Sequence, residues 1–296
     1  MRIYYPYLRG KQFELQALLA LQKADKLSLA VIPIIEPVRD SHYLADCVAT
    51  FITAGRPLII ISNPQVGTYQ QHRQQRYPLT QWQASPYFKH ALLVTKATSL
   101  ADYLAADVLL FTHPDVLTVF PEPQSQQLVI VGPSHRLRRQ LNYQVTLTDP
   151  TPQGWDGADY LLQPQTFFSD QPWFATATGF SDFVTVGAGY SDKGYPVPFI
   201  KLTLTVPRSR QLWLHHFIST DFSDFKQPKA KYFSAGTQLV AWLKLHPEVP
   251  LTLGLAALQT SIQQAHFPGL GKVKQWLLMH HLELVAQILN VNNHEC

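Results

Sequence analysis

The stretch HALLVTKATSLADYLAADVLLFTH (90–113) contains two apolar strands joined by one short helix. HALLVTK (90–96) and DVLLFTH (107–113) do not alternate polar and apolar residues, which is typical of strands covered on both faces in a parallel sheet. Between them, Ser99 is placed to cap a helix that runs to Ala105, with Asp102 in its first turn. This strand–helix–strand unit predicts an α/β fold.

The same pattern extends through the first half of the chain. An amphipathic helix is expected over residues 12–23, and a second over residues 40–54 that begins at Asp40 or Ser41. Four more apolar runs are predicted to be strands: LSLAVIPIIEP (27–37), RPLIIIS (56–62), QLVIVGP (127–133) and QVTLTD (144–149). Some spacings between strands are short for complete strand–helix units, so any barrel they form is expected to be irregular.

The pattern changes after residue 150. Residues 150–180 are expected to form a long ordered loop, followed by a strand at DFVTVG (182–187). FIKLTLTV (199–206) alternates, with Lys201, Thr203 and Thr205 on one face, and it is predicted to pair with LWLHHFIS (212–219) as an antiparallel hairpin. Helices are expected over residues 230–245 and 272–289.

These elements predict one domain with an irregular TIM-barrel-like α/β closure, an antiparallel hairpin and C-terminal helices. Residues 1–150 are the strand–helix half, residues 151–225 the loop and hairpin half, and residues 226–296 the C-terminal helices. We expect the hairpin to contribute antiparallel strands to the barrel, which disfavours an all-parallel barrel of eight strands. The alternative is an open mixed sheet followed by a helical cap.

Composition restricts the class of protein. The 296 residues are 46% hydrophobic and 15% charged, which excludes a disordered chain. The net charge of +4 is a weaker basic bias than dedicated nucleic-acid binders show. Cys47 and Cys296 cannot form a disulfide framework, and no signal peptide or apolar run near the ~20 residues needed to cross a bilayer is found. We therefore expect a soluble cytoplasmic protein without a membrane segment.

Polar side chains follow many of the expected strands, at the ends where parallel α/β sheets carry functional groups. They are Glu36, Asn63, Lys96, His113 with Asp115, His135 with Arg136, Asp149, and Asp182. Such a rim can support acid–base chemistry or bind an anion, although strand ends that meet water commonly carry polar residues. The candidate catalytic residues are Glu36, Asp182, His113 and Lys96.

SHRLRRQ (134–140) is the densest cluster of positive charge. Arg136, Arg138 and Arg139 follow an apolar strand and a Gly-Pro turn, which suits an element that faces phosphate groups. The alternative is a solvated basic helix face. Arg9 and Lys11, in a turn before the first helix, are two further candidates for binding an anionic ligand. Either of them can instead pair with Glu36 and anchor the N-terminal segment.

No pattern predicts a metal or a cofactor. His215 and His216 are adjacent in a strand and point to opposite faces. His280 and His281 are about 100° apart on a helix, without the spacing of a zinc motif, so His280 is expected to be a hydrogen-bonded histidine of the core or of an interface. The glycine-containing segments 187–194 and 267–274 match no nucleotide-binding fingerprint.

Glu36 is the most constrained candidate. Pro37 favours an extended conformation for Glu36 at the end of its strand, and burial of its carboxylate without a partner costs several kcal/mol. We expect Glu36 to lie within one side-chain length of Lys96, Arg9 or Lys11, in a pocket that also contains His113 or Asp182.

Five stretches carry a family resemblance: YYPYLRGKQFELQALLAL (4–21), IPIIEP (32–37), GFSDFVTVG (179–187), IKLTLTV with LWLHHFIS (200–219) and HFPGLGKVKQWLLMHHLEL (266–284). The opening Tyr-x-Pro-x-Leu-Arg-Gly-Lys with Glu14, and the Pro-x-Ile-Glu-Pro strand, are the most specific parts. They resemble the phage beta-protein family, in particular a bacterial branch found in mobile, defence-like gene neighbourhoods. The resemblance implies a barrel-like α/β fold and a role in phage–host conflict, and it implies no particular reaction.

Two classes of function follow. The first is a binding or effector component of a phage-defence or mobile-element system, acting with a partner protein encoded nearby on nucleic acid or a phosphorylated ligand. The alternative is a barrel hydrolase or lyase that uses the rim carboxylates Glu36, Asp149 and Asp182 and requires them to converge. The sequence leaves open whether the protein is an enzyme.

Overall fold

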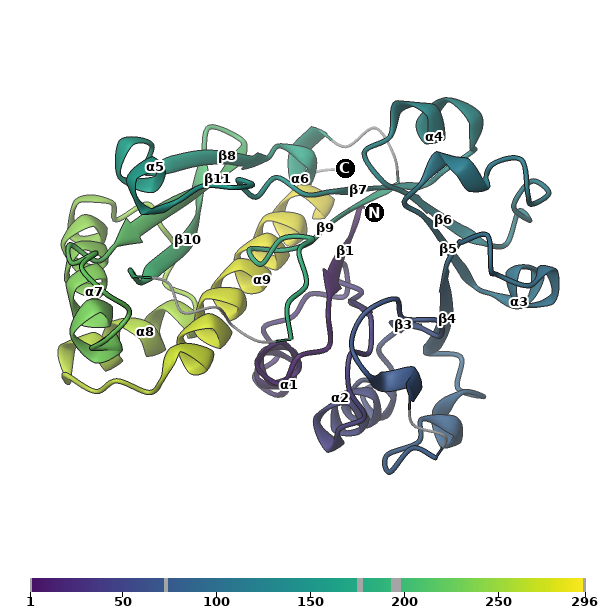
Figure 1. Cartoon of the computed structure of the whole chain (residues 1–296), viewed down its shortest axis with the longest axis horizontal. Helices are drawn as coiled ribbons and strands as arrows, with labels where there is room; N and C mark the ends of the chain where they lie inside the picture. Colours follow the sequence, from purple (N-terminus) through teal and green to yellow (C-terminus); the bar gives the residue numbers. More distant parts are fainter. Residues whose placement is uncertain (1, 72–73, 175–177, 193–197, 295–296) are drawn as a thin grey trace.

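The computed structural model describes residues 2–71, 74–174, 178–192 and 198–294. Eight parallel strands form a closed barrel in the order β1–β2–β3–β4–β5–β6–β7–β9 (Figure 1). They are β1 (Ile3–Leu8), β2 (Ile34–Ile35), β3 (Leu58–Ile61), β4 (Phe88–Leu93), β5 (Val108–Phe111), β6 (Leu128–Val131), β7 (Val145–Thr148) and β9 (Gly179–Asp182). The predicted TIM-barrel-like α/β fold is confirmed.

Helices cover the outside of the barrel: α1 (Gln12–Lys23), α2 (His42–Thr53), α3 (Leu100–Ala105) and α4 (His135–Gln140), with short 3-10 turns η1 (Tyr69–Gln71), η2 (Thr80–Trp82) and η3 (Pro114–Val116). Along β2, Ile34 packs inside the barrel while Ile35 packs outward against α1 and α2. Because both faces are apolar, the barrel strands lack alternation. Ser41 and Ser99 cap α2 and α3 as predicted, each hydroxyl accepting a backbone N–H three residues later.

β9 completes the barrel by pairing with β7 on one side and β1 on the other. The predicted strand at 182–187 is wrong, because the strand covers Gly179–Asp182 and the chain then turns at Val184, whose φ is 49°. The expected long loop also contains regular elements: α5 (Gly157–Leu162), β8 (Gln165–Ser169) and α6 (Gln171–Phe174).

The hairpin lies outside the barrel. β10 (Lys201–Arg208) and β11 (Gln211–Ile218) pair antiparallel and form a three-stranded sheet with β8. The expectation that the hairpin supplies antiparallel barrel strands is wrong, since β9 bonds both neighbours and leaves no open edge. The apolar face of β10, with Leu202 and Leu204, instead packs on the C-terminal helices.

Those helices are α7 (Pro228–Leu245), α8 (Leu253–Gln263) and α9 (Leu270–His294). Figure 1 shows α9 in yellow between the antiparallel sheet and the barrel, and it contacts both α1 and β10. Gly254 of α8 lies against the backbone of α9, at a distance that a β-carbon would not permit. No helix in the described ranges is long and apolar enough to span a membrane.

Candidate functional site

Glu36 lies fully buried at the carboxyl end of β2, on the inner side of the barrel wall. The Tyr7 hydroxyl donates to Oε2 at 2.7 Å, and the backbone N–H of Gln65 donates to Oε1 at 2.7 Å. The Arg9 guanidinium forms an ion pair with the same carboxylate. The predicted contact between Glu36 and one of the named cations is therefore confirmed, and the cation is Arg9.

Arg9 and Lys11 hold the loop that follows β9. Arg9 donates to the carbonyl of Ala188 at 2.6 Å, and the N–H of Ala188 donates to Asp149 at 2.9 Å. Lys11 Nζ donates to the carbonyl of Ser191 at 3.0 Å. These contacts tie one loop to the ends of β1 and β7, so both predicted ligand-binding cations are occupied by the protein itself.

Asp182 lies on the outer side of the barrel wall. Its Oδ1 accepts from the Tyr4 hydroxyl at 2.6 Å and from the N–H of Val184 at 2.8 Å. Burial raises the pKa of Asp182 to about 7, although the two hydrogen bonds act to lower it. The expectation that Asp182 shares a pocket with Glu36 is wrong, because Asp182 follows the outward-facing Phe180 by two positions, whereas Glu36 follows the inward-facing Ile34.

The hydrogen bonds of Asp182 continue into α9. His281 Nε2 lies 2.9 Å from the Tyr4 hydroxyl, and its Nδ1 lies 2.9 Å from the Thr205 hydroxyl. Since Tyr4 donates its proton to Asp182, His281 must donate through Nε2 and accept from Thr205 at Nδ1. Burial lowers the pKa of His281 to about 3, so the ring is neutral. His280 is also buried, with both ring nitrogens bonded, as expected of a core histidine.

The remaining candidate catalytic residues lie at the surface. Lys96 pairs with Asp115 at 3.2 Å, and both side chains are exposed. His113 is exposed beside them, at the start of η3. Asp149 accepts from Thr151, Gln153 and Ala188. The hydrolase or lyase hypothesis requires Glu36, Asp149 and Asp182 to meet, and Glu36 and Asp182 face opposite sides of the wall.

The arginine cluster forms α4 as expected. Arg136 and Arg139 are exposed and line a surface depression with His135 and Gln140. Arg138 is half-buried, and among the described residues its Nε has no hydrogen-bond partner. The guanidinium groups of Arg136 and Arg139 thus lie on one turn of the helix without a hydrogen-bond or ion-pair partner among the described residues.

A small cavity lies between the barrel loops and the antiparallel sheet. Its volume is about 150 Å³, and we name it the Lys201 cavity. Residues 151–153, after β7, and residues 185–187 with Gly189, after β9, line one side. Tyr160, Lys201, Thr203, Leu214 and His216 line the other side. The cavity therefore lies at the carboxyl ends of the seventh and eighth barrel strands.

Lys201 supplies the positive charge of this cavity. Its Nζ lies 3.8 Å from the centroid of the Tyr160 ring, and no described carboxylate lies within ion-pair distance of it. Partial desolvation, with repulsion from Lys274, lowers the pKa of Lys201 to about 8. His216 bonds Thr166 and Thr203 through its two ring nitrogens, and burial lowers its pKa to about 3. Among the described residues that line the cavity, Lys201 is thus the cation at neutral pH and His216 is a neutral imidazole.

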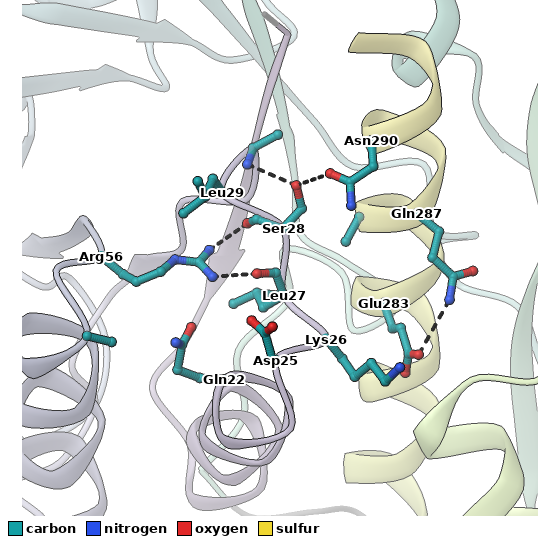
Figure 2. Close-up of a pocket in the computed structure, with 13 residues that line it drawn as sticks. Gln22, Asp25, Lys26, Leu27, Ser28, Leu29, Arg56, Glu283, Gln287 and Asn290 are labelled. Atoms are coloured by element: carbon teal, nitrogen blue, oxygen red, sulfur yellow. Dashed lines mark hydrogen bonds between the residues drawn. The ribbon is translucent and has the colours of Figure 1, made fainter. Parts of the chain in front are cut away.

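A cavity of about 960 Å³ lies at the amino-terminal end of the barrel, opposite the Lys201 cavity. Figure 2 shows the side chains that line it. The turn after α1, the end of α2 and one face of α9 line it. Arg56 crosses its wall and donates to the carbonyls of Leu27, Ser28 and Val31. Because Arg56 binds this turn and Ser28 binds Asn290 of α9, these contacts hold the amino-terminal end of the barrel together. That end of a TIM barrel generally serves stability.

Comparison with known proteins finds no matching family model, no matching curated protein and no matching solved structure. Within the described ranges, no group of three or more His, Cys, Asp or Glu side chains is arranged to hold a metal ion.

Lys201 is not among the site residues predicted from the sequence. The available signal was the alternation of residues 199–206, which places Lys201 and Thr203 on the polar face of a strand. That face meets the barrel loops, which only the packing of the sheet against the barrel reveals.

Proposed function

We propose that this protein binds a small phosphorylated ligand in the Lys201 cavity. The observation that carries the proposal is a lysine with no carboxylate partner among the described residues, in a cavity between the loops after the seventh and eighth barrel strands. TIM barrels commonly bind phosphate at this place, so analogy with that fold supports the same class of ligand here.

The chemistry of the cavity supports an anionic ligand. Lys201 has no carboxylate to neutralise it among the described residues, and Lys274 adds positive potential. The face of Tyr160 stabilises the ammonium form. Gly189 lines the cavity with space beside its α-carbon, which lets a ligand approach the backbone closely. A volume of about 150 Å³ suits a group of phosphate size, since pockets for drug-sized ligands start at roughly 300 Å³.

The positions of the three candidate carboxylates favour a binding function over a hydrolytic one. Glu36 is saturated by Tyr7, Arg9 and Gln65, and Asp149 is bonded to the loops beside it. Asp182 is sealed behind Tyr4 and α9. None of these three lines the Lys201 cavity. The resemblance to the phage beta-protein family extends the proposal to a role beside a partner protein in phage–host conflict.

Calorimetric titration with inorganic phosphate and with pyrophosphate at pH 7 tests the proposal. Lys201→Met should weaken binding by about 10- to 100-fold, because a charge-assisted hydrogen bond contributes about 1.5–3 kcal/mol. Lys244→Met, an exposed lysine at the end of α7, is the matched control and should bind as the wild type does. Equal affinity of Lys201→Met and wild type would overturn the assignment.

Nucleic acid is the competing ligand, and the α4 cluster is its natural contact. Retention on heparin at about 0.15 M salt that is lost in Arg136→Gln/Arg139→Gln and kept in Lys201→Met would favour it. We expect the reverse, with weak heparin retention and phosphate binding that depends on Lys201.

A further inference from the structure

Lys201 is placed to act as a nucleophile as well as a cation. We propose that its amine forms a reversible imine with the carbonyl group of a small phosphorylated aldehyde or ketone, which rests on the proposed function of the cavity. The geometry that carries this inference is an amine at a cavity wall, without a carboxylate partner among the described residues and beside a second positive charge. Lysines that form imines are commonly activated in such surroundings.

The state of the amine supports the inference. An ordinary lysine, with a pKa near 10.4, is almost entirely protonated at neutral pH and has no lone pair for attack. Desolvation and Lys274 lower the pKa of Lys201 to about 8, so a substantial fraction is neutral at pH 7.5. The Tyr160 ring favours the ammonium form and limits this fall.

Two other lysines, which are paired with carboxylates, lack these properties. Lys231 is more deeply buried, yet its Nζ faces Asp221 and Asp224 and donates to the carbonyl of Pro198. Lys96 pairs with Asp115. Both amines face carboxylates, whereas Lys201 does not, so they serve as internal controls.

The step balances without an oxidant or reductant. The nitrogen lone pair attacks the carbonyl carbon, the C=O π electrons move to oxygen, and that oxygen takes a proton. The nitrogen then gives up one proton to solvent, the carbinolamine hydroxyl takes a proton from solvent and leaves as water, and the nitrogen lone pair forms the C=N bond of a protonated imine. Lys201 is partly desolvated at the cavity wall but still reaches solvent, so water can exchange the protons. The protonated imine keeps a positive charge near the phosphate group of the ligand.

Reductive trapping on the full chain tests the inference. The protein is incubated at pH 7.5 with glyceraldehyde 3-phosphate and sodium cyanoborohydride, and modified lysines are located by peptide mass spectrometry. We expect modification of Lys201 at least 10-fold above Lys244, Lys96 and Lys231, with a pH profile half-maximal near pH 8. Modification of Lys201 at the level of Lys244 would overturn the inference.

Two comparisons separate this inference from the proposed function. Phosphate binding by calorimetry without selective trapping at Lys201 leaves the proposed function and removes the imine. Equal trapping of Lys201 by unphosphorylated glyceraldehyde keeps the imine and contradicts phosphate recognition. Lys201→Arg cannot form an imine but keeps its charge, so it should bind phosphate more tightly than Lys201→Met.

Discussion

At the scale of single residues, the ion pair of Glu36 and Arg9 fixes the mouth of the barrel. Only 14% of the Arg9 side chain and none of the Glu36 side chain is exposed. Glu36→Ala leaves a mostly buried guanidinium unpaired, and we expect it to lower the free energy of unfolding by about 3–5 kcal/mol. Urea denaturation measures this, with exposed Glu122→Ala as control. A loss no larger than in Glu122→Ala would contradict the structural role of Glu36.

Asp182 makes a prediction about pH. Because burial raises its pKa to about 7, the folded state holds a proton that the unfolded state has released, so this residue lowers stability as pH rises from about 4 to 7. Asp182→Asn removes that dependence, and its amide oxygen can still accept from Tyr4 and Val184. The free energy of unfolding of Asp182→Asn, relative to that of the wild type, should therefore rise by about 1 kcal/mol or more between pH 4.5 and pH 8. A difference that is constant over this range would contradict the raised pKa.

The surroundings of Glu36 could be predicted from the sequence, but those of Asp182 could not, and the reason is physical. Pro37 sets the conformation of Glu36 locally, so its place at a strand end and its need for a cation can be derived from neighbours in the chain. The side of the wall that Asp182 faces depends on the register of β9, and the predicted strand began three residues late. A strand placed only by its apolar residues does not fix that register.

At the scale of elements, the contact of α8 with α9 depends on one glycine. A β-carbon at Gly254 would collide with the carbonyl oxygen of Trp276, which is backbone and cannot rotate away. We expect Gly254→Ala to destabilise the protein by about 1–3 kcal/mol despite the better helix propensity of alanine. Gly189→Ala meets no atom and is the control for stability. Thermal denaturation compares the two, and a stabilised Gly254→Ala would show that the helices pack less closely.

The hairpin shows what alternation does and does not reveal. The alternating residues of β10 correctly separated an apolar face with Leu202 from a polar face with Lys201. This alternation does not indicate which sheet the strand joins. β9 pairs with both β1 and β7, so the barrel has no free edge at which β10 could bind. The candidate site was missed for that reason, since Lys201 becomes a site residue only when the hairpin stands beside the barrel loops.

At the scale of the whole molecule, α9 joins the barrel to the antiparallel sheet, and we expect one cooperative unfolding transition. Cys47 is fully buried in α2, and burial raises the pKa of its thiol to about 12, so it should react with a thiol reagent only after unfolding. Five of the six tryptophans lie at or beyond residue 155 and report on the second half of the chain. In a Cys296→Ser background, the urea midpoints of Cys47 labelling and tryptophan fluorescence should coincide. Separate midpoints would mean that barrel and sheet unfold independently.

The barrel itself followed from the sequence because consecutive apolar strands with short helices between them have few ways to bury both faces. The closure of the barrel by Gly179–Asp182 could not be predicted from the sequence, because this strand is only four residues long and follows a segment that resembled a loop. The eighth strand matters for the site, because the loop after it lines the Lys201 cavity.

The position of a bound phosphate analogue in a crystal shows directly whether the Lys201 cavity holds an anion. Crystals of the full chain grown with tungstate, located by its anomalous scattering, would show where a tetrahedral anion binds. We expect a site between residues 151–153 and 185–189, within hydrogen-bond distance of Lys201 Nζ, that is absent in Lys201→Met. Tungstate bound only at Arg136 and Arg139 of α4, with an empty Lys201 cavity, would contradict this expectation.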